Sequence, residues 1–131
     1  MGEYNTQANP LYITTPDEGV DEIAGAAVDQ YAILKLNSSN RFVMMAAGDA
    51  GNLMVGVALT AAAGNGSAIK VLQIYGITSY MLSDGTGTIT TGELVSPSAT
   101  VAGRVMQDDA DPVGTARTTV AATLHAQLQV L

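Results

Sequence analysis

Residues 31–46 have the sequence YAILKLNSSNRFVMMA. Two largely apolar runs, Tyr31–Leu36 and Arg41–Ala46, flank a polar segment of Asn and Ser at positions 37–40. Asn and Ser favour turns because their short side chains hydrogen-bond to the nearby backbone. Short apolar runs bounded by turn residues are typical of strands. The segment therefore predicts an antiparallel β-hairpin.

The rest of the chain repeats this pattern of short apolar runs between turns. Turn residues recur about every eight to twelve positions, and the expected strands are 53–60, 68–80, 94–96, 100–107, 113–120 and 123–131. This spacing predicts an all-β protein, a small β-barrel or β-sandwich of short antiparallel strands. Both faces of 68–80 are apolar, so we expect that strand to be buried on both sides or at a subunit contact.

Two parts of the chain resemble each other. Arg41–Met45, an Asp-containing turn and Val55-Gly56 recur as Gly103–Gln107, an Asp-rich turn and Val113-Gly114, and each copy precedes another expected strand. This is the pattern of a duplicated three-strand unit. Chance similarity in Val-, Ala- and Gly-rich sequence explains it equally well, and the sequence leaves both explanations open.

The N-terminal part differs in charge from the rest. Residues 1–30 contain six acidic residues and no Lys or Arg, a balance of −6, whereas the other 101 residues carry six acids and five bases, a balance of −1. We therefore expect an acidic, extended N-terminal arm over 1–30 and a single β-domain over 31–131. Within the arm, Leu11–Thr15 lies between two prolines and favours an extended segment, and Asp17–Val28 suggests a brief helical turn.

Composition excludes several classes of protein. The 131 residues fit one domain, and a 47% hydrophobic content with only 5% aromatic residues predicts a thin core that partner subunits or a host surface help to stabilise. A net charge of −7 with only five basic residues argues against nucleic-acid binding. No cysteine is present, which excludes disulfides and Cys-ligated metals. Glycines and asparagines interrupt the uncharged segment 50–69, so no membrane span is predicted, and no secretory signal is expected at the start.

Candidate chemical groups are few. His125 is the only imidazole, and its place within an expected strand favours a solvent-facing side chain over a catalytic one. Asp108, Asp109 and Asp111 could coordinate calcium, but a solvated acidic turn is favoured because the closing Glu of a calcium loop is missing. The segment 84–88, DGTGT, is interpreted as a hairpin turn rather than a phosphate loop because it has no Lys. We therefore predict no catalytic residues, no cofactor and no metal, and an enzyme is the least favoured class.

Several motifs together indicate a family. They are Val55–Leu59 followed by a small-residue loop and an apolar strand, Thr91–Val95, Val113–Ala116, and a closing Leu-x-Ala-x-Leu-x-Val strand at 124–130. With the acidic arm, this pattern resembles the small capsid decoration, or cement, proteins of tailed bacteriophages over residues 28–131. Its motifs are glycine- and valine-based structural signals.

The resemblance implies a structural role in a virion. Copies of such proteins sit on the outer surface of the expanded head, often as trimers, and clamp neighbouring major capsid subunits. The implied partners are the major capsid protein and further copies of the chain, with neither nucleic acid nor membrane involved. The family's arm adds to capsid β-structure, a role that falls here on Leu11, Tyr12, Ile13, Thr14 and Thr15.

Two alternatives remain at the level of sequence. One is another virion component, such as a head-fibre or tail subunit. The other is a small-ligand or glycan-binding β-domain, against which the lack of Trp and the presence of only five Tyr argue, because ligand pockets are commonly lined by aromatic groups.

Overall fold

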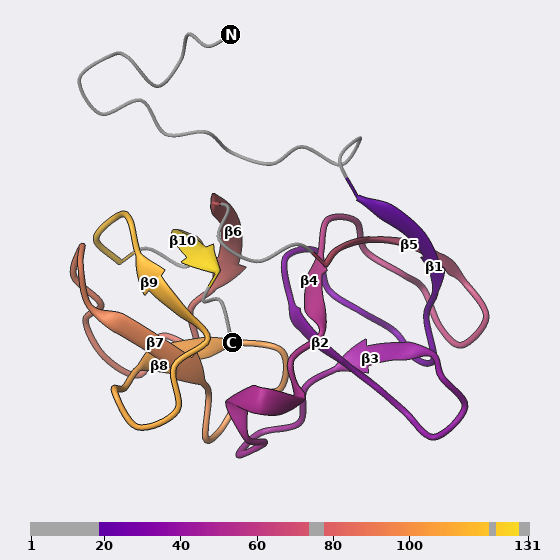
Figure 1. Ribbon diagram of the computed structural model, residues 1–131, viewed down its shortest axis with the longest axis horizontal. Helices are drawn as coiled ribbons and strands as arrows, with labels where there is room; N and C mark the ends of the chain where they lie inside the picture. Colours follow the sequence, from indigo (N-terminus) through magenta and orange to yellow (C-terminus); the bar gives the residue numbers. More distant parts are fainter. Residues whose placement is uncertain (1–18, 74–77, 121–122, 129–131) are drawn as a thin grey trace, which may run out of the picture.

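The computed structural model describes residues 19–73, 78–120 and 123–128, and these form an all-β protein of two five-stranded antiparallel sheets (Figure 1). The predicted fold class is confirmed, and the hairpin predicted for residues 31–46 is present as β2 and β3. The strands are β1 (Val20–Ile23), β2 (Ile33–Leu36), β3 (Phe42–Met44), β4 (Gly56–Ala58), β5 (Ala68–Leu72), β6 (Thr78–Leu82), β7 (Leu94–Pro97), β8 (Val105–Gln107), β9 (Gly114–Ala116) and β10 (Thr123–Leu128). A short 3-10 turn, η3 (Gly51–Leu53), precedes β4.

The two sheets have the same topology. The first has the strand order β1-β5-β4-β2-β3 and the second has β6-β10-β9-β7-β8, so matching β1–β5 to β6–β10 in chain order gives the same neighbours throughout. The similar segments noted in the sequence fall at matching places, in β3 and β4 of the first sheet and β8 and β9 of the second. The correspondence thus relates five strands to five, including pairs without visible sequence similarity.

The registers also agree residue by residue. Leu34 of β2 pairs with Met44 and Gly56, and Val95 of β7 pairs with Gln107 and Gly114. Leu34 therefore corresponds to Val95, and Gly56 to Gly114. By the same rule Arg41, Val55 and Ala58 correspond to Arg104, Val113 and Ala116, three further positions that carry identical residues.

Each sheet curls until its two edge strands meet. An isolated parallel bridge joins Ala24, just after β1, to Phe42 of β3, and a corresponding bridge joins Ser83 to Val105. We call residues 19–73 the first barrel and residues 78–128 the second barrel, since closure of a sheet on itself makes a barrel. Figure 1 shows them side by side, the first at the right and the second at the left.

Small aliphatic side chains fill the first barrel. Alternate residues of each strand point to its interior, and the only aromatic side chain among them is that of Phe42. The buried residues of this cluster are Ala24, Val28, Ala32, Leu34, Phe42, Ala58, Ala62, Ile69 and Val71.

The second core joins the two barrels. It contains interior residues of the second barrel, such as Val95 and Val105, together with residues from the outer face of the first. Ile33, Val57 and Leu72 lie opposite one another across β2, β4 and β5, and each is at most 1% exposed. Burial of each such side chain contributes about 1.5–3 kcal/mol. The outer face of the first barrel is therefore part of the shared core.

Backbone hydrogen bonds also cross between the barrels. Gly103 donates its N–H to the carbonyl of Met45 (2.8 Å) and accepts from the N–H of Ile33 (3.0 Å). The N–H of Gly48 donates to the carbonyl of Ser98 (2.9 Å). Because these bonds are directional and far apart in sequence, they fix the orientation of one barrel against the other.

Two local predictions at the N-terminal side are wrong. Val20–Ile23 forms a strand paired with β5, not part of a helical turn over Asp17–Val28. Residues of the acidic segment expected to form an arm up to position 30 are therefore part of the first sheet from Val20 onward. The cause is tertiary, because a partner strand about fifty residues away supplies the backbone bonds that a local pattern does not reveal.

Two predictions near the junction of the barrels are also wrong. The run 68–80 is not one strand, because its ends belong to β5 and β6, which lie in different sheets. The segment 84–88 does form a turn, with Gly85 at φ +76°, but it does not connect a hairpin since β6 and β7 are not neighbours. Both faces of β5 are buried, since Ile69 and Val71 lie in the core of the first barrel and Leu72 lies in the core that the two barrels share.

Candidate functional site

The outer edge of β1 is the candidate interaction site. β1 is an end strand of its sheet, and its register places Asp21 opposite Lys70 and Glu22 opposite Ile69 of β5. In an antiparallel pair, hydrogen-bonded and non-hydrogen-bonded positions alternate. The phase of this alternation decides which backbone groups of β1 point outward.

The hydrogen bonds around β5 settle that phase. The N–H of Ala24 donates to the carbonyl of Ser67 (2.9 Å), so Ala24, Glu22 and Val20 direct their backbone groups toward β5. Lys70 uses its own backbone on the other side, donating to Thr60 Oγ1 (3.0 Å) and accepting from the N–H of Leu59 (2.8 Å). Asp21 therefore presents its N–H and C=O groups at the outer edge, and Ile23 presents its N–H there.

This open edge is bounded within the fold. From Ala24 onward β3 covers it, through the bridge to Phe42 and the bond from the N–H of Gly25 to the carbonyl of Phe42 (2.8 Å). Within the described ranges, no strand pairs with the outer edge of β1 before Ala24. An unpaired strand edge is a template for an added strand.

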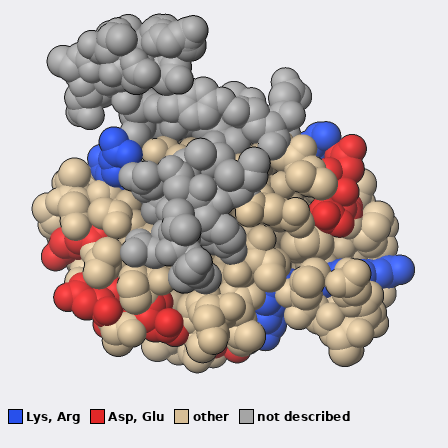
Figure 2. Space-filling model, viewed as in Figure 1, with Lys and Arg blue, Asp and Glu red and all other residues tan. Residues whose placement is uncertain are grey.

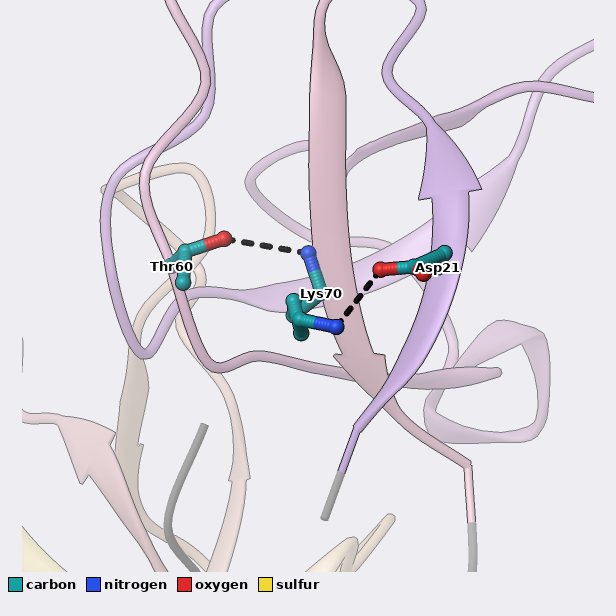
Figure 3. Close-up of polar contacts among 3 residues, drawn as sticks. All are labelled: Asp21, Thr60 and Lys70. Atoms are coloured by element: carbon teal, nitrogen blue, oxygen red, sulfur yellow. Dashed lines mark hydrogen bonds and ion pairs between the residues drawn. The ribbon is translucent and has the colours of Figure 1, made fainter. Parts of the chain in front are cut away.

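Side chains around the edge are accessible. Val20 and Ile23 are 47% and 45% exposed. Across the strand pair, the Lys70 ammonium lies 2.7 Å from a carboxylate oxygen of Asp21 (Figure 3). This ion pair is solvent-exposed and so contributes at most about 1 kcal/mol. It leaves an edge with two apolar side chains beside a weakly held charge pair.

The corresponding edge of the second barrel has a different environment. Tyr80 of β6 corresponds to Asp21, and its ring lies 4.9 Å from the ring of Tyr31, centroid to centroid, in the first barrel. Figure 1 shows β6 on the side of its barrel that faces the first barrel, and β1 on the far outer side of the first. Of the two corresponding edges, that of β1 is the one directed to the outside.

Charge on the surface is unevenly distributed. Figure 2 shows a face that is mostly uncharged, with acidic side chains in a few small groups and basic ones scattered. A second ion pair joins Lys35 and Asp49 at 2.6 Å. The hydrogen bonds from Lys35 and from the N–H of Ala46 hold the pKa of Asp49 below its usual value.

The segment predicted to bind a capsid, Leu11–Thr15, lies outside the described residues, which begin at Gly19. His125 lies in β10, opposite Tyr80 in the register. Sequence reasoning missed β1 as an edge strand. The run Val20–Ile23 between Gly19 and Gly25 has strand length and was the available signal.

The three aspartates of the 108–111 turn do not form a cation site. Asp108 accepts from the N–H of Ala110 (3.0 Å), and Asp109 accepts from Gln107 Nε2 (3.2 Å). Asp111 accepts from the N–H of Gly51 in the first barrel, so it links the barrels rather than standing in solvent. In the part of the chain that the structure describes, no group of three His, Cys, Asp or Glu side chains is arranged to hold a metal ion.

Comparison of the chain with protein-family models, curated proteins and solved structures gives no match. Among the described residues, no helix has the length and apolarity of a membrane span.

Proposed function

We propose that the protein is a structural virion component that decorates the outside of a phage head and stabilises it by clamping neighbouring major capsid subunits. The observation that carries this proposal is the open edge of β1, directly after the N-terminal segment that contains Leu11–Thr15. The family resemblance of the sequence supplies the rest of the proposal, including self-association as a trimer. No catalytic step is assigned to the protein.

Strand addition suits a clamp. A partner strand placed beside β1 gains hydrogen bonds from the N–H and C=O groups of Asp21 and from the N–H of Ile23, without requiring particular side chains. Each such bond contributes about 0.5–1.5 kcal/mol net, so one contact is weak. Many copies on one shell add up to strong attachment, because each bound copy raises the effective concentration of the next contact.

The body that carries this edge is suited to bridging. The shared core and the backbone hydrogen bonds hold the two barrels together as one unit, with β1 at one side (Figure 1). A unit of this kind transmits force between two points of attachment better than two barrels on a linker.

Sedimentation with stripped heads tests the proposal. Purified protein is mixed with heads that lack it, and bound copies per major capsid subunit are counted after pelleting. We expect saturable, near-stoichiometric binding that raises the resistance of the heads to heat. Binding of a few copies per particle would assign the protein to a vertex or tail instead, and no binding would refute the proposal.

Two variants at β1 separate the backbone from the side chain. Asp21→Pro and Asp21→Ala both remove the ion pair with Lys70, but only Asp21→Pro also removes the outward N–H. Proline is tolerated at an edge strand when its nitrogen faces outward. We expect Asp21→Ala to bind heads like the wild type and Asp21→Pro to bind at least tenfold more weakly, with both variants folded by circular dichroism.

Deletion of residues 1–16 tests the arm separately. These residues precede the first described strand, so we expect the two barrels to remain folded while head binding is lost. Binding that survives this deletion but not Asp21→Pro would place the attachment on β1 alone.

A further inference from the structure

The first barrel has a polar cavity at the point where it closes. The cavity has a volume of about 380 Å³ and is lined by Gly25, Asn37, Ser39, Arg41 and Asn65, which we call the Arg41 pocket. All five residues are at least partly exposed, so the pocket is accessible from solvent. Its volume falls in the range of small-molecule sites, roughly 300–1,000 Å³.

The second barrel has different residues at the positions that correspond to the Arg41 pocket. Gly25 corresponds to Asp84, since their N–H groups donate to the carbonyls of the matched residues Phe42 (2.8 Å) and Val105 (3.0 Å). The pocket's arginine corresponds to Arg104. An arginine thus occupies the same register position in both barrels, where Arg41 Nη1 donates to Asn65 Oδ1 and Arg104 Nη1 donates to the carbonyl of Ser83 (3.0 Å). Only in the second barrel does the residue matched to Gly25 carry a carboxylate.

A turn residue with an oxygen-bearing side chain is common to both places. Asn37 and Ser98 each donate their N–H to the carbonyl of the matched arginine, at 2.9 Å and 2.8 Å. Asn37 Oδ1 accepts from the N–H groups of Ser39 (2.9 Å) and Arg41 (3.0 Å). Ser98 Oγ accepts likewise from the two backbone N–H groups that follow it at 100 and 101 (both 3.0 Å).

In the second barrel the chain itself supplies the acid. Asp84 accepts a hydrogen bond from the hydroxyl of Ser98 and two more from the N–H (2.9 Å) and hydroxyl (2.7 Å) of Thr86. Burial raises the pKa of Asp84, but these hydrogen bonds and the nearby charge of Arg104 outweigh burial and leave the pKa below its usual value. The site therefore stabilises an ionised carboxylate.

In the first barrel that acid is missing and donors take its place. A Cβ at Gly25 would lie 2.5 Å from Asn37 Nδ2, so the amide of Asn37 occupies the space next to Gly25. The carbonyl oxygen of this amide is already used, which leaves its NH₂ as the donor. Arg41 Nη1 donates to Asn65 Oδ1 (2.8 Å), and Arg41 forms no ion pair with any described residue.

We propose that the Arg41 pocket binds a carboxylate group, with the guanidinium of Arg41 and the amide NH₂ of Asn37 as its donors. A planar guanidinium matches the two oxygens of a carboxylate, and no acidic side chain lines the pocket to repel one. Two sources present this chemistry, a free small acid and an Asp or Glu side chain of another protein. This inference does not rest on the proposed capsid function.

A titration of the isolated protein tests it. We would follow the ¹⁵N amide shifts of Gly25, Asn37 and Arg41 while adding succinate or, as a matched neutral probe, succinamide. We expect saturable shifts with succinate and none with succinamide at the same concentration. Equal shifts with succinate and succinamide would overturn the proposal. The absence of any shift with both succinate and a capped Gly-Glu-Gly peptide would also overturn it.

Matched variants in the two barrels identify the donor. We expect Arg41→Gln to weaken succinate binding at least tenfold, and Arg104→Gln to leave it unchanged because Asp84 fills the second place. Thermal unfolding checks that both variants fold. Arg41→Gln with unchanged affinity would refute the assignment of Arg41.

A gain-of-function variant guards against a loss caused by misfolding. The double variant Asp84→Gly, Ser98→Asn copies the first barrel into the second, and we expect it to acquire a second set of saturable shifts around Arg104. A capped peptide Gly-Glu-Gly distinguishes the two sources. At least tenfold tighter binding than succinate assigns the site to a protein partner, and equal or weaker binding assigns it to a free acid.

Discussion

Tyr31 and Gly92 occupy corresponding positions in the two barrels and share a left-handed backbone conformation. Their φ angles are +69° and +95°, and their N–H groups donate to the matched carbonyls of Ala58 (2.6 Å) and Ala116 (2.8 Å). This conformation costs a residue with a side chain about 1–2 kcal/mol. The fold therefore requires the same strained turn twice, and the first barrel accepts the strain with a tyrosine whose ring packs on Tyr80.

The cost of that turn can be measured at Gly92. A Cβ there would meet open space, so Gly92→Ala changes only the conformational preference of the backbone. We expect a loss of about 1 kcal/mol in the free energy of unfolding, measured by urea denaturation.

Gly103→Ala is the matched comparison, because Gly103 is also left-handed (φ +75°) but closely packed. Its Cβ would lie 2.8 Å from Met44 Sδ and 3.0 Å from Ala32 Cβ, beside the bonds that join the barrels. Overpacking adds about 1–3 kcal/mol to the strain. Equal losses for the two variants would contradict the close approach at Gly103.

A second prediction concerns the bond between the carboxylate of Asp111 and the N–H of Gly51, which lie 60 positions apart in the chain. Asp111→Ala leaves that partly buried N–H without its acceptor, and we expect it to lower the free energy of unfolding by about 1–3 kcal/mol. Asp109→Ala is the control, since exposed Asp109 bonds only to the side chain of Gln107. It should change stability by less than about 0.5 kcal/mol. A similar effect of both would mean that Asp111 does not link the barrels.

A third prediction is loss of stability in acid. The pKa of Asp49 is lowered in the folded state, mainly by its hydrogen bond with Lys35, and that of Asp84 is also lowered. A lowered folded pKa means that the stabilisation is complete above the unfolded value, about 3.9, and disappears as the pH falls through the folded value. We expect the free energy of unfolding to decrease as the pH is lowered from about 5 to 2.

Variants at the Lys35–Asp49 ion pair test the origin of this decrease in stability at low pH. Asp49→Asn and Lys35→Gln should each reduce the acid-dependent loss of stability, by less than about 1 kcal/mol because the pair is partly exposed. The effect of Lys35→Gln should be the smaller one, because the N–H of Ala46 still lowers the pKa of Asp49 in that variant. In the double variant, the acid-dependent loss in the free energy of unfolding should be reduced no further than in Asp49→Asn alone. If the reductions caused by the two single substitutions added up in the double variant, the two side chains would act independently.

Local pattern was enough to predict part of this fold. The hairpin of residues 31–46 is encoded by its own turn, so the sequence predicts β2 and β3 without reference to the rest of the chain. The repeat was visible where both copies keep an arginine before a strand and a Val-Gly pair after a turn. Its first strands were not, because Val20–Ile23 and Thr78–Leu82 share no pattern and gain their partners through long-range pairing.

The Arg41 pocket shows the same limit for sites. Its arginine lies inside the repeated motif, so the signal was present in the sequence. The role of the arginine depends on the residue at the matched position after β1 or β6, which is Gly25 in the first barrel and Asp84 in the second. Only the register of the strands relates these two positions. A sequence pattern does not predict which side chain another strand brings to a site.

The last prediction tests how the barrels pack. Val57 of β4 is fully buried between Ile33 and Leu72 on the outer face of the first barrel, whereas its counterpart Thr115 in the second barrel is only half-buried. Val57→Thr places a hydroxyl in the shared core at a cost of about 1–3 kcal/mol. Thr115→Val makes the converse change at a half-buried position, and we expect it to change the free energy of unfolding by less than about 0.5 kcal/mol. Urea denaturation of the two variants measures the difference. Equal effects would mean that Val57 and Thr115 are equally covered, and the packing of the outer face of the first barrel against the second barrel would then be wrong.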